Sequence, residues 1–273
     1  MGLLKRVFDF YIDSYMHVSI AAFCLTKITL LEFGITENTS PLFVLFATFI
    51  SYNFIRYYDT LKGLTPFVSW MKSHKIELFL LNLISYIFLV IFALKLRYEA
   101  LFFLIPFALA TIFYVVPFTS HNKNLRNISG LKLFLIAISW AGVTVLFPII
   151  NNEYLLTKDV WFVFFQRFVF LFAVTIPFDI RDLTYDIPEL KTLPQTIGLK
   201  KSKLLGSAFL LIFFISDFFR FSIFENSVTI TSILTILSFV LLNIVNENRS
   251  KYYTSFWIEA IPLFWYLLII LIK

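Results

Sequence analysis

The stretch "IELFLLNLISYIFLVIFAL", residues 76–94, decides the class of this protein. It carries a single charged residue, Glu77, and a run of about 20 largely apolar residues is long enough to cross a lipid bilayer as a helix. Backbone groups in lipid have to be hydrogen-bonded internally, and long apolar runs achieve this as helices rather than as barrel strands. The stretch therefore predicts a membrane-spanning helix.

The composition of the whole chain agrees with this prediction. Of its 273 residues, 59% are hydrophobic, and the mean hydropathy is +0.84. In soluble domains roughly half of the residues are apolar. The net charge of +6 does not indicate nucleic-acid binding, because the Lys and Arg residues lie in short loops between apolar runs. We expect a polytopic membrane protein with the lipid bilayer, and no nucleic acid, as a partner.

Apolar runs predict nine membrane-spanning helices, which we expect to form a single all-α domain over residues 17–273. The arm at 1–16 has Leu4, Val7, Phe8, Tyr11 and Tyr15 at helical spacing, with its charges on other faces, which predicts an amphipathic helix on the membrane surface. The nine predicted spans are 17–35, 41–57, 76–94, 99–118, 131–150, 159–178, 203–222, 227–245 and 253–272.

The charges between the spans predict the orientation. Most Lys and Arg residues lie in the N-terminal arm and in every second loop, and such loops face the cytoplasm. The N-terminus is therefore expected in the cytoplasm and, with nine spans, the C-terminus on the opposite side. We expect a multi-pass protein of a cell membrane, specifically a bacterial inner membrane.

Three carboxylates follow the sixth predicted span. In "FDIRDLTYDIPELKTLPQTIGLKK" (178–201), Asp179, Asp182 and Asp186 have spacings that place side chains on one face of a helix. Carboxylate oxygens suit Mg²⁺, which also binds substrate phosphates. The alternative is a solvated helix end in which Asp182 pairs with Arg181 or Lys191. Because ionisable groups next to a span are functional candidates, we favour a metal site.

A short similarity between two segments of the chain suggests that the chain consists of two related halves. The segment "NFIRYYDTL" (53–61) also closes a span on the same predicted side, and Ile55-Arg56 aligns with Ile180-Arg181. Two such halves would form a pseudo-symmetric bundle around one central cavity.

With these motifs, the chain resembles the UbiA superfamily of intramembrane prenyltransferases. The resemblance covers the topology of the whole chain and is most specific in "DIRDLTYD" (179–186) followed by "KTLPQTIG" (191–198). It implies a UbiA-like bundle of nine transmembrane helices around a lipid-open cavity. It also implies transfer of a polyprenyl group from polyprenyl diphosphate to an aromatic or other membrane-associated acceptor, with Mg²⁺ as cofactor.

The resemblance also implies roles for individual residues. Tyr114 and the loop "NKNLR" (122–126) are similar to the family's tyrosine and basic loop. The implied catalytic residues are Tyr114, Asp182 and Asp186, and the implied Mg²⁺ ligands are Asp179, Asp182 and Asp186. The implied diphosphate contacts are Asn53, Arg56, Lys123, Arg126, Arg181 and Lys191, and Lys132 is a further candidate.

The first acidic motif of the family is lost here. Asn53 matches it, but Phe54, Tyr57 and Leu61 stand where the family has aspartates, and Asp59 is out of phase. A diphosphate in a low-dielectric cavity needs strong charge compensation, which basic residues would then have to supply. The alternative hypothesis is a catalytically altered or inactive homologue that serves in lipid binding, transport or assembly.

Four further ionisable residues, Lys27, Arg167, Asp217 and Glu259, lie within or near the predicted spans. Such residues line cavities, pair with each other or reach toward the interface. We favour pairing or reaching outward over a functional role. A secondary transporter also has midplane charges, but it would not explain the "DIRDLTYD…KTLPQTIG" string.

Overall fold

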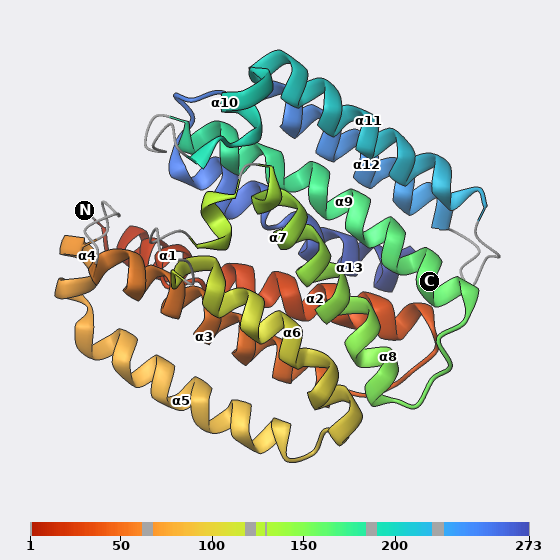
Figure 1. Cartoon of the computed structure of the whole chain (residues 1–273), viewed down its shortest axis with the longest axis horizontal. Helices are drawn as coiled ribbons and strands as arrows, with labels where there is room; N and C mark the ends of the chain where they lie inside the picture. Colours follow the sequence, from red (N-terminus) through yellow and green to blue (C-terminus); the bar gives the residue numbers. More distant parts are fainter. Residues whose placement is uncertain are drawn as a thin grey trace.

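In the computed structural model, the chain is a bundle of long helices (Figure 1). The structure describes residues 2–61, 68–117, 124–128, 130–183, 190–219 and 227–272, and these ranges contain no strand. The helical class predicted from the apolar runs is confirmed for these ranges. The predicted site residues Lys123 and Asp186 lie outside them.

Long helical segments occupy all the predicted spans. Residues 131–151 form one segment from α7, the π-helical turn η2 and α8, and η4 is a second π-helical turn at the start of α13. The elements are α1 (Leu3–Asp13), α2 (Met16–Glu32), α3 (Thr39–Leu61), α4 (Val68–Ser73), α5 (Lys75–Ala93), α6 (Tyr98–Val115), η1 (Leu125–Asn127), α7 (Leu131–Ala141), η2 (Gly142–Leu146), α8 (Phe147–Asn151), α9 (Lys158–Asp182), α10 (Leu193–Ile197), α11 (Leu199–Asp217), α12 (Ser227–Ile244), η4 (Tyr253–Ile258) and α13 (Ile261–Ile272).

Among the described residues, six segments are long and apolar enough to cross a membrane. They are Lys75–Ala93, Tyr98–Val115, Leu131–Asn151, Lys158–Asp182, Ser227–Ile244 and Tyr253–Ile272. A seventh is possible if α1 and α2, which meet at a bend of 57°, form one broken span. Of the other predicted spans, α3 ends in a polar turn, and α11 begins with a run of lysines and ends at Asp217. A membrane location is supported, whereas nine spans remain a prediction.

The helices differ in how much apolar surface they bury. The main core lies where α2, α7, α9, α11, α12 and α13 meet, and the rings of Phe170, Phe213 and Trp265 pack there in tilted and edge-on pairs with centroids 4.9–5.7 Å apart. By contrast, α5 lies at one edge of the bundle in Figure 1, and its side chains are largely exposed, with Phe79 at 65%. Water would penalise so large an apolar surface, so lipid is the solvent that fits it.

A glycine sets the close packing of three helices. A Cβ atom added at Gly206 of α11 would lie 2.7 Å from Leu242 Cδ2 of α12 and 2.9 Å from Ile176 Cδ1 of α9. Small residues let helices approach closely in membranes, where dispersion contacts replace the hydrophobic effect as the packing force. Gly206 therefore determines how near α9 and α12 lie to α11.

Helix α1 is attached to the segment that precedes the last span. Lys251 Nζ lies 2.7 Å from Asp13 Oδ2, the Tyr252 hydroxyl donates to Asp9, and Phe8 packs edge-on against Phe256. The bond to Asp9 raises the pKa of Tyr252 to about 12. Apolar side chains of α1 stay exposed nonetheless, with Leu4 at 87%. The N-terminal arm thus packs against the segment before the last span and still presents apolar side chains outward.

Candidate functional site

Ionisable side chains gather at one end of the bundle, the left-hand end in Figure 1, where α1, α4 and α10 lie. They come from α3, α6, η1, α7, α9 and the residue that follows η4. Two groups can be distinguished by their contacts. The Asp179 group consists of Asp59, Tyr114, Arg126, Lys132 and Asp179. The Glu259 group consists of Tyr52, Arg56, Arg181, Asp182 and Glu259.

The Asp179 group is centred on a buried carboxylate. Asp179 is 1% exposed and lies near the end of α9, two residues after Pro177. Lys132 Nζ, at the start of α7, is 2.6 Å from Asp179 Oδ1. The other oxygen, Oδ2, has no hydrogen-bond partner among the described residues. Since a buried polar atom without a partner is costly, this oxygen is a candidate ligand atom.

A second ion pair lies in the same group. Arg126 Nη1 of η1 is 3.1 Å from Asp59 Oδ2 of α3, and both side chains are mostly buried. Tyr114, near the end of α6, interacts electrostatically with both pairs, that is, with Asp59, Arg126, Lys132 and Asp179. The structure thus brings together three predicted site residues, Tyr114, Arg126 and Asp179, and the further candidate Lys132. It adds Asp59, to which the sequence assigns no role.

Asp182 is engaged locally. Its two carboxylate oxygens accept hydrogen bonds of 2.7 and 3.0 Å from Nε and Nη2 of Arg181. Arg181 Nη1 also donates to the hydroxyl groups of Thr254 and Ser255, at 2.6 and 3.1 Å. This Asp182–Arg181 pair is the one that the alternative interpretation of the motif, a solvated helix end, predicts. It ties the end of α9 to η4.

A metal site of three side chains is not formed by the residues that the structure describes. In those ranges, no three His, Cys, Asp or Glu side chains are arranged to hold a metal ion. Asp186, the third carboxylate of the predicted site, lies outside them. The predicted Mg²⁺ site therefore stays a prediction.

Asn53 and Arg56 hold the junction between α1 and α2. Asn53 Nδ2 donates to Ser14 O at 3.2 Å, Arg56 Nε donates to the Tyr15 hydroxyl at 3.1 Å, and Arg56 Nη1 donates to Asp13 O. The residue at the bend, Tyr15, has a left-handed backbone with φ of 67°. Both α3 side chains therefore make hydrogen bonds at this junction, and their expected contact with a diphosphate stays a prediction.

The three apolar or aromatic residues that the sequence comparison placed opposite aspartates are exposed on α3. Phe54, Tyr57 and Leu61 are 37%, 56% and 66% exposed. They do not fill the centre of the ionisable cluster.

The segment "KTLPQTIG" forms a helix start. Thr192 is the N-cap of the short helix α10, its backbone N–H donates to Gln195 Oε1 at 3.0 Å, and Gly198 closes the turn with φ of 82°. This capping box explains the Thr-Leu-Pro-Gln order by local structure. Lys191 is exposed ahead of it.

The remaining charges in the spans lie away from the cluster. Lys27 Nζ reaches the α2–α3 loop and donates to Glu37 O and Asn38 Oδ1 at 3.1 and 2.9 Å, which confirms the expectation that it reaches outward. Arg167 is buried, donates to Leu25 O at 2.9 Å and lies over the Trp265 ring. Asp217 accepts a bond of 3.2 Å from Gln166.

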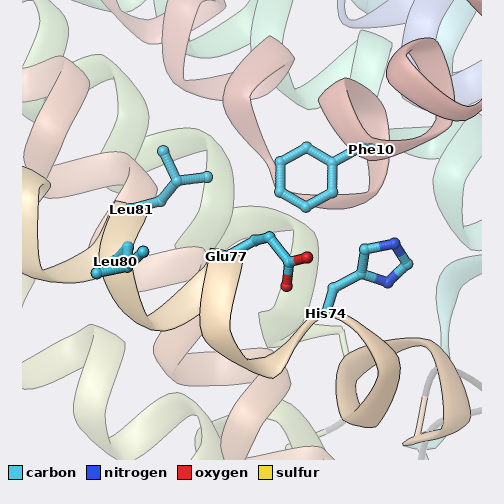
Figure 2. A pocket seen from close by; sticks show the side chains of 5 residues that line it. All are labelled: Phe10, His74, Glu77, Leu80 and Leu81. Carbon is cyan, nitrogen blue, oxygen red and sulfur yellow. The ribbon is translucent and has the colours of Figure 1, made fainter.

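An open groove of about 430 Å³ lies between α1 and α5 (Figure 2). Phe10, Leu80 and Leu81 make most of its lining apolar, while His74 and Glu77 stand at its polar end. None of the residues in the two ionisable groups lines it. We therefore place the candidate site at the ionisable cluster, where charges from distant segments meet, and not in this groove.

Comparison with known protein families, with curated proteins and with solved structures finds no match for this chain.

Proposed function

We propose that this protein is a membrane prenyltransferase of UbiA-like type, which binds a polyprenyl diphosphate at the cytoplasmic end of a nine-helix bundle. The prenyl group would pass to a membrane-associated acceptor. One observation carries the proposal: Asp59, Tyr114, Arg126, Lys132 and Asp179 come from five separate elements and gather in an otherwise apolar bundle. Buried ion pairs contribute little net stability, so stability alone is a poor reason for such a cluster.

The basic members of the Asp179 group suit a diphosphate. Arg126 and Lys132 are held by carboxylates beside the Tyr114 side chain, so their positive charge is already in place when no anion is bound. Arg forms paired hydrogen bonds to phosphate oxygens. A cation that is already in position before the reaction stabilises the charge that develops on a leaving group without having to move. In this proposal Arg126 and Lys132 bind the diphosphate, and the Tyr114 hydroxyl donates to one of its oxygens.

One buried carboxylate oxygen supports Mg²⁺ as the cofactor in this proposal. The buried Oδ2 of Asp179 lacks a hydrogen-bond partner among the described residues, and carboxylate oxygens are the ligands that Mg²⁺ prefers. Asp179, Asp182 and Asp186 would hold the ion. When bound, Mg²⁺ supplies positive charge that offsets the charge of the diphosphate.

A second candidate function is binding of a phosphate-bearing lipid without turnover. It is favoured by the engagement of Asp182 with Arg181 and by the exposed, non-acidic Phe54, Tyr57 and Leu61. Together these leave fewer carboxylates for metal ions than two acidic motifs would provide. The two functions share the diphosphate site and differ in whether the bond to the prenyl chain breaks.

The first experiment measures thermal stabilisation of the detergent-purified protein by geranylgeranyl diphosphate, with and without Mg²⁺. A ligand at 100 times its Kd stabilises the folded state by about 2.7 kcal/mol. We expect stabilisation that requires Mg²⁺ and is lost in Asp182→Asn. The matched control is Asp159→Asn, because Asp159 lies in the first turn of the same helix, at its other end. No stabilisation of the wild type would refute the proposal.

Release of diphosphate decides between the two functions. An enzyme should release diphosphate from geranylgeranyl diphosphate when an acceptor is added, and Asp182→Asn should abolish the release. Binding without release would support the second function. Release that persists in Asp182→Asn would refute the role of this carboxylate.

A further inference from the structure

The groove between α1 and α5 holds an acidic side chain that pairs with no described residue. Glu77 lies in the first turn of α5, is exposed, and lines the groove with Phe10, His74, Leu80 and Leu81. Within the described ranges, its carboxylate makes neither a hydrogen bond nor an ion pair. In Figure 2 the carboxylate points toward the space between the Phe10 and His74 rings. The helix dipole favours an acid in a first turn, but it does not explain the rings around this one.

Aromatic rings and a second acceptor lie at the same end of the groove. The ring centroids of Phe10 and His74 are 5.6 Å apart, and Trp70 stacks on His74 at 4.8 Å. His74 Nδ1 lies 3.0 Å from Trp70 O and donates to it, because a carbonyl oxygen only accepts. In the neutral imidazole Nε2 is then an acceptor, and it makes no hydrogen bond with a described residue. The groove therefore offers both Nε2 and the Glu77 carboxylate as acceptors.

A primary ammonium group matches the chemistry of this end of the groove. It carries one positive charge and three N–H donors, which the Glu77 carboxylate and His74 Nε2 can accept. The faces of aromatic rings attract cations, most strongly where water is excluded. Arg56 already lies over the Trp70 ring at 5.6 Å, so Phe10 and His74 are the rings that remain for a ligand. An anionic group would instead be repelled by the unpaired carboxylate.

The other end of the groove suits a hydrocarbon chain. Leu80 and Leu81 lie one helical turn further along α5, which is long and apolar enough to cross a membrane. The groove thus runs from the polar end of a span toward its apolar middle, as a lipid does in a bilayer. Lys72 and Lys75 are exposed close to His74 in the sequence, and a phospholipid carries a phosphate next to its ammonium. A soluble amine would use only the polar half of this groove.

We infer that the groove binds a phospholipid whose headgroup ends in a primary ammonium, as in phosphatidylethanolamine. The ammonium lies between Glu77 and His74, and the phosphate faces the two exposed lysines. One acyl chain lies along Leu80 and Leu81. The inference stands apart from the proposed function, because none of the described residues assigned to the diphosphate lines this groove.

The test measures the Kd of three phospholipids that share their acyl chains and differ in the headgroup. Dioleoyl phosphatidylethanolamine, phosphatidylcholine and phosphatidylglycerol are titrated into the delipidated, detergent-purified full chain, and bound lipids are counted by native mass spectrometry. We expect phosphatidylethanolamine to bind about tenfold more tightly than phosphatidylglycerol, which corresponds to about 1.4 kcal/mol. Phosphatidylcholine should bind more weakly than phosphatidylethanolamine, because its quaternary ammonium has no N–H donor.

Three variants locate the binding site. Glu77→Gln removes the charge and keeps the size of the side chain, so it should remove most of the preference. The matched control is Glu247→Gln, the same substitution at an exposed glutamate after α12, which should leave the preference unchanged. Phe10→Leu keeps the lining apolar but removes an aromatic face, so it should weaken binding of phosphatidylethanolamine more than binding of phosphatidylglycerol. Glu77→Gln breaks no side-chain contact among the described residues and should fold as the wild type does, with helicity checked by circular dichroism.

Several results would overturn the inference. Equal Kd values for phosphatidylethanolamine and phosphatidylglycerol in the wild type would show that the headgroup is not recognised. A preference that persists in Glu77→Gln, or that Glu247→Gln also removes, would show that Glu77 does not bind the ammonium. Phosphatidylcholine that binds as tightly as phosphatidylethanolamine would exclude hydrogen bonds from the ammonium. Glycerophosphoethanolamine, the same headgroup without acyl chains, should not compete, and equal competition would make the ligand a soluble amine rather than a lipid.

Discussion

Replacing Lys132 by Met should destabilise the protein strongly, because it leaves the Asp179 carboxylate buried without its cation. The two charged atoms are 2.6 Å apart, and Asp179 is 1% exposed. At an effective dielectric constant of about 20, Coulomb's law gives on the order of 6 kcal/mol for charges this close. Desolvation offsets part of that attraction, and removal of one partner of a buried pair typically costs about 3–5 kcal/mol. We expect a loss of about 3 kcal/mol, since Lys132 keeps some exposure.

The assay is reversible unfolding in mixed micelles, with helicity followed by circular dichroism. The double variant Lys132→Met/Asp179→Leu supplies the decisive comparison, because two apolar side chains in place of a buried ion pair are often neutral or stabilising. We expect it to recover most of the stability that Lys132→Met loses. A change below about 0.5 kcal/mol for Lys132→Met would refute the reasoning, because surface substitutions have effects of that size. Equal losses in the single and double variants would show that Lys132 acts through other contacts.

Three further predictions test the packing. Gly206→Ala should lower the free energy of unfolding by about 1–3 kcal/mol, because the added Cβ would come too close to Leu242. Leu204→Ala, on the exposed face of the same helix, should change the free energy of unfolding by less than about 0.5 kcal/mol. Arg56→Met should loosen the junction between α1 and α2, so trypsin should cleave within α1 several times faster while helicity stays the same. Unchanged cleavage would contradict that role. Cys24 is buried, so a maleimide should label it only after unfolding, and rapid labelling of the folded protein would contradict its position.

Local features of the chain were predictable where neighbouring residues decide them. The apolar runs placed the helices to within a few residues, because the length and hydropathy of a run are local properties. The pairing of Asp182 with Arg181 was foreseen as an alternative, since adjacent residues on a helix end meet whatever surrounds them. The capping box of Thr192 and Gln195 is readable in the same way, from a three-residue spacing.

Other features depended on how the helices are rotated against each other. Asp59 and Arg126 are 67 residues apart, and hydropathy does not say which faces of α3 and η1 meet. Arg56 makes hydrogen bonds to Tyr15 and to the backbone of Asp13, and the sequence does not indicate that the bend between α1 and α2 lies against this end of α3. Glu259 was visible as an acid in an apolar span, but the sequence did not indicate that it interacts electrostatically with arginines of two other helices.

The sequence by itself therefore determined the helical class, the membrane environment and the acidic end of α9, because each follows from residues close together in the chain. Only the tertiary structure decided which charge meets which. Lys132 pairs with Asp179, and Arg126 pairs with Asp59. The physical reason is that a charge inside an apolar bundle is governed by partners on other helices, and those partners are fixed by packing rather than by spacing along the chain.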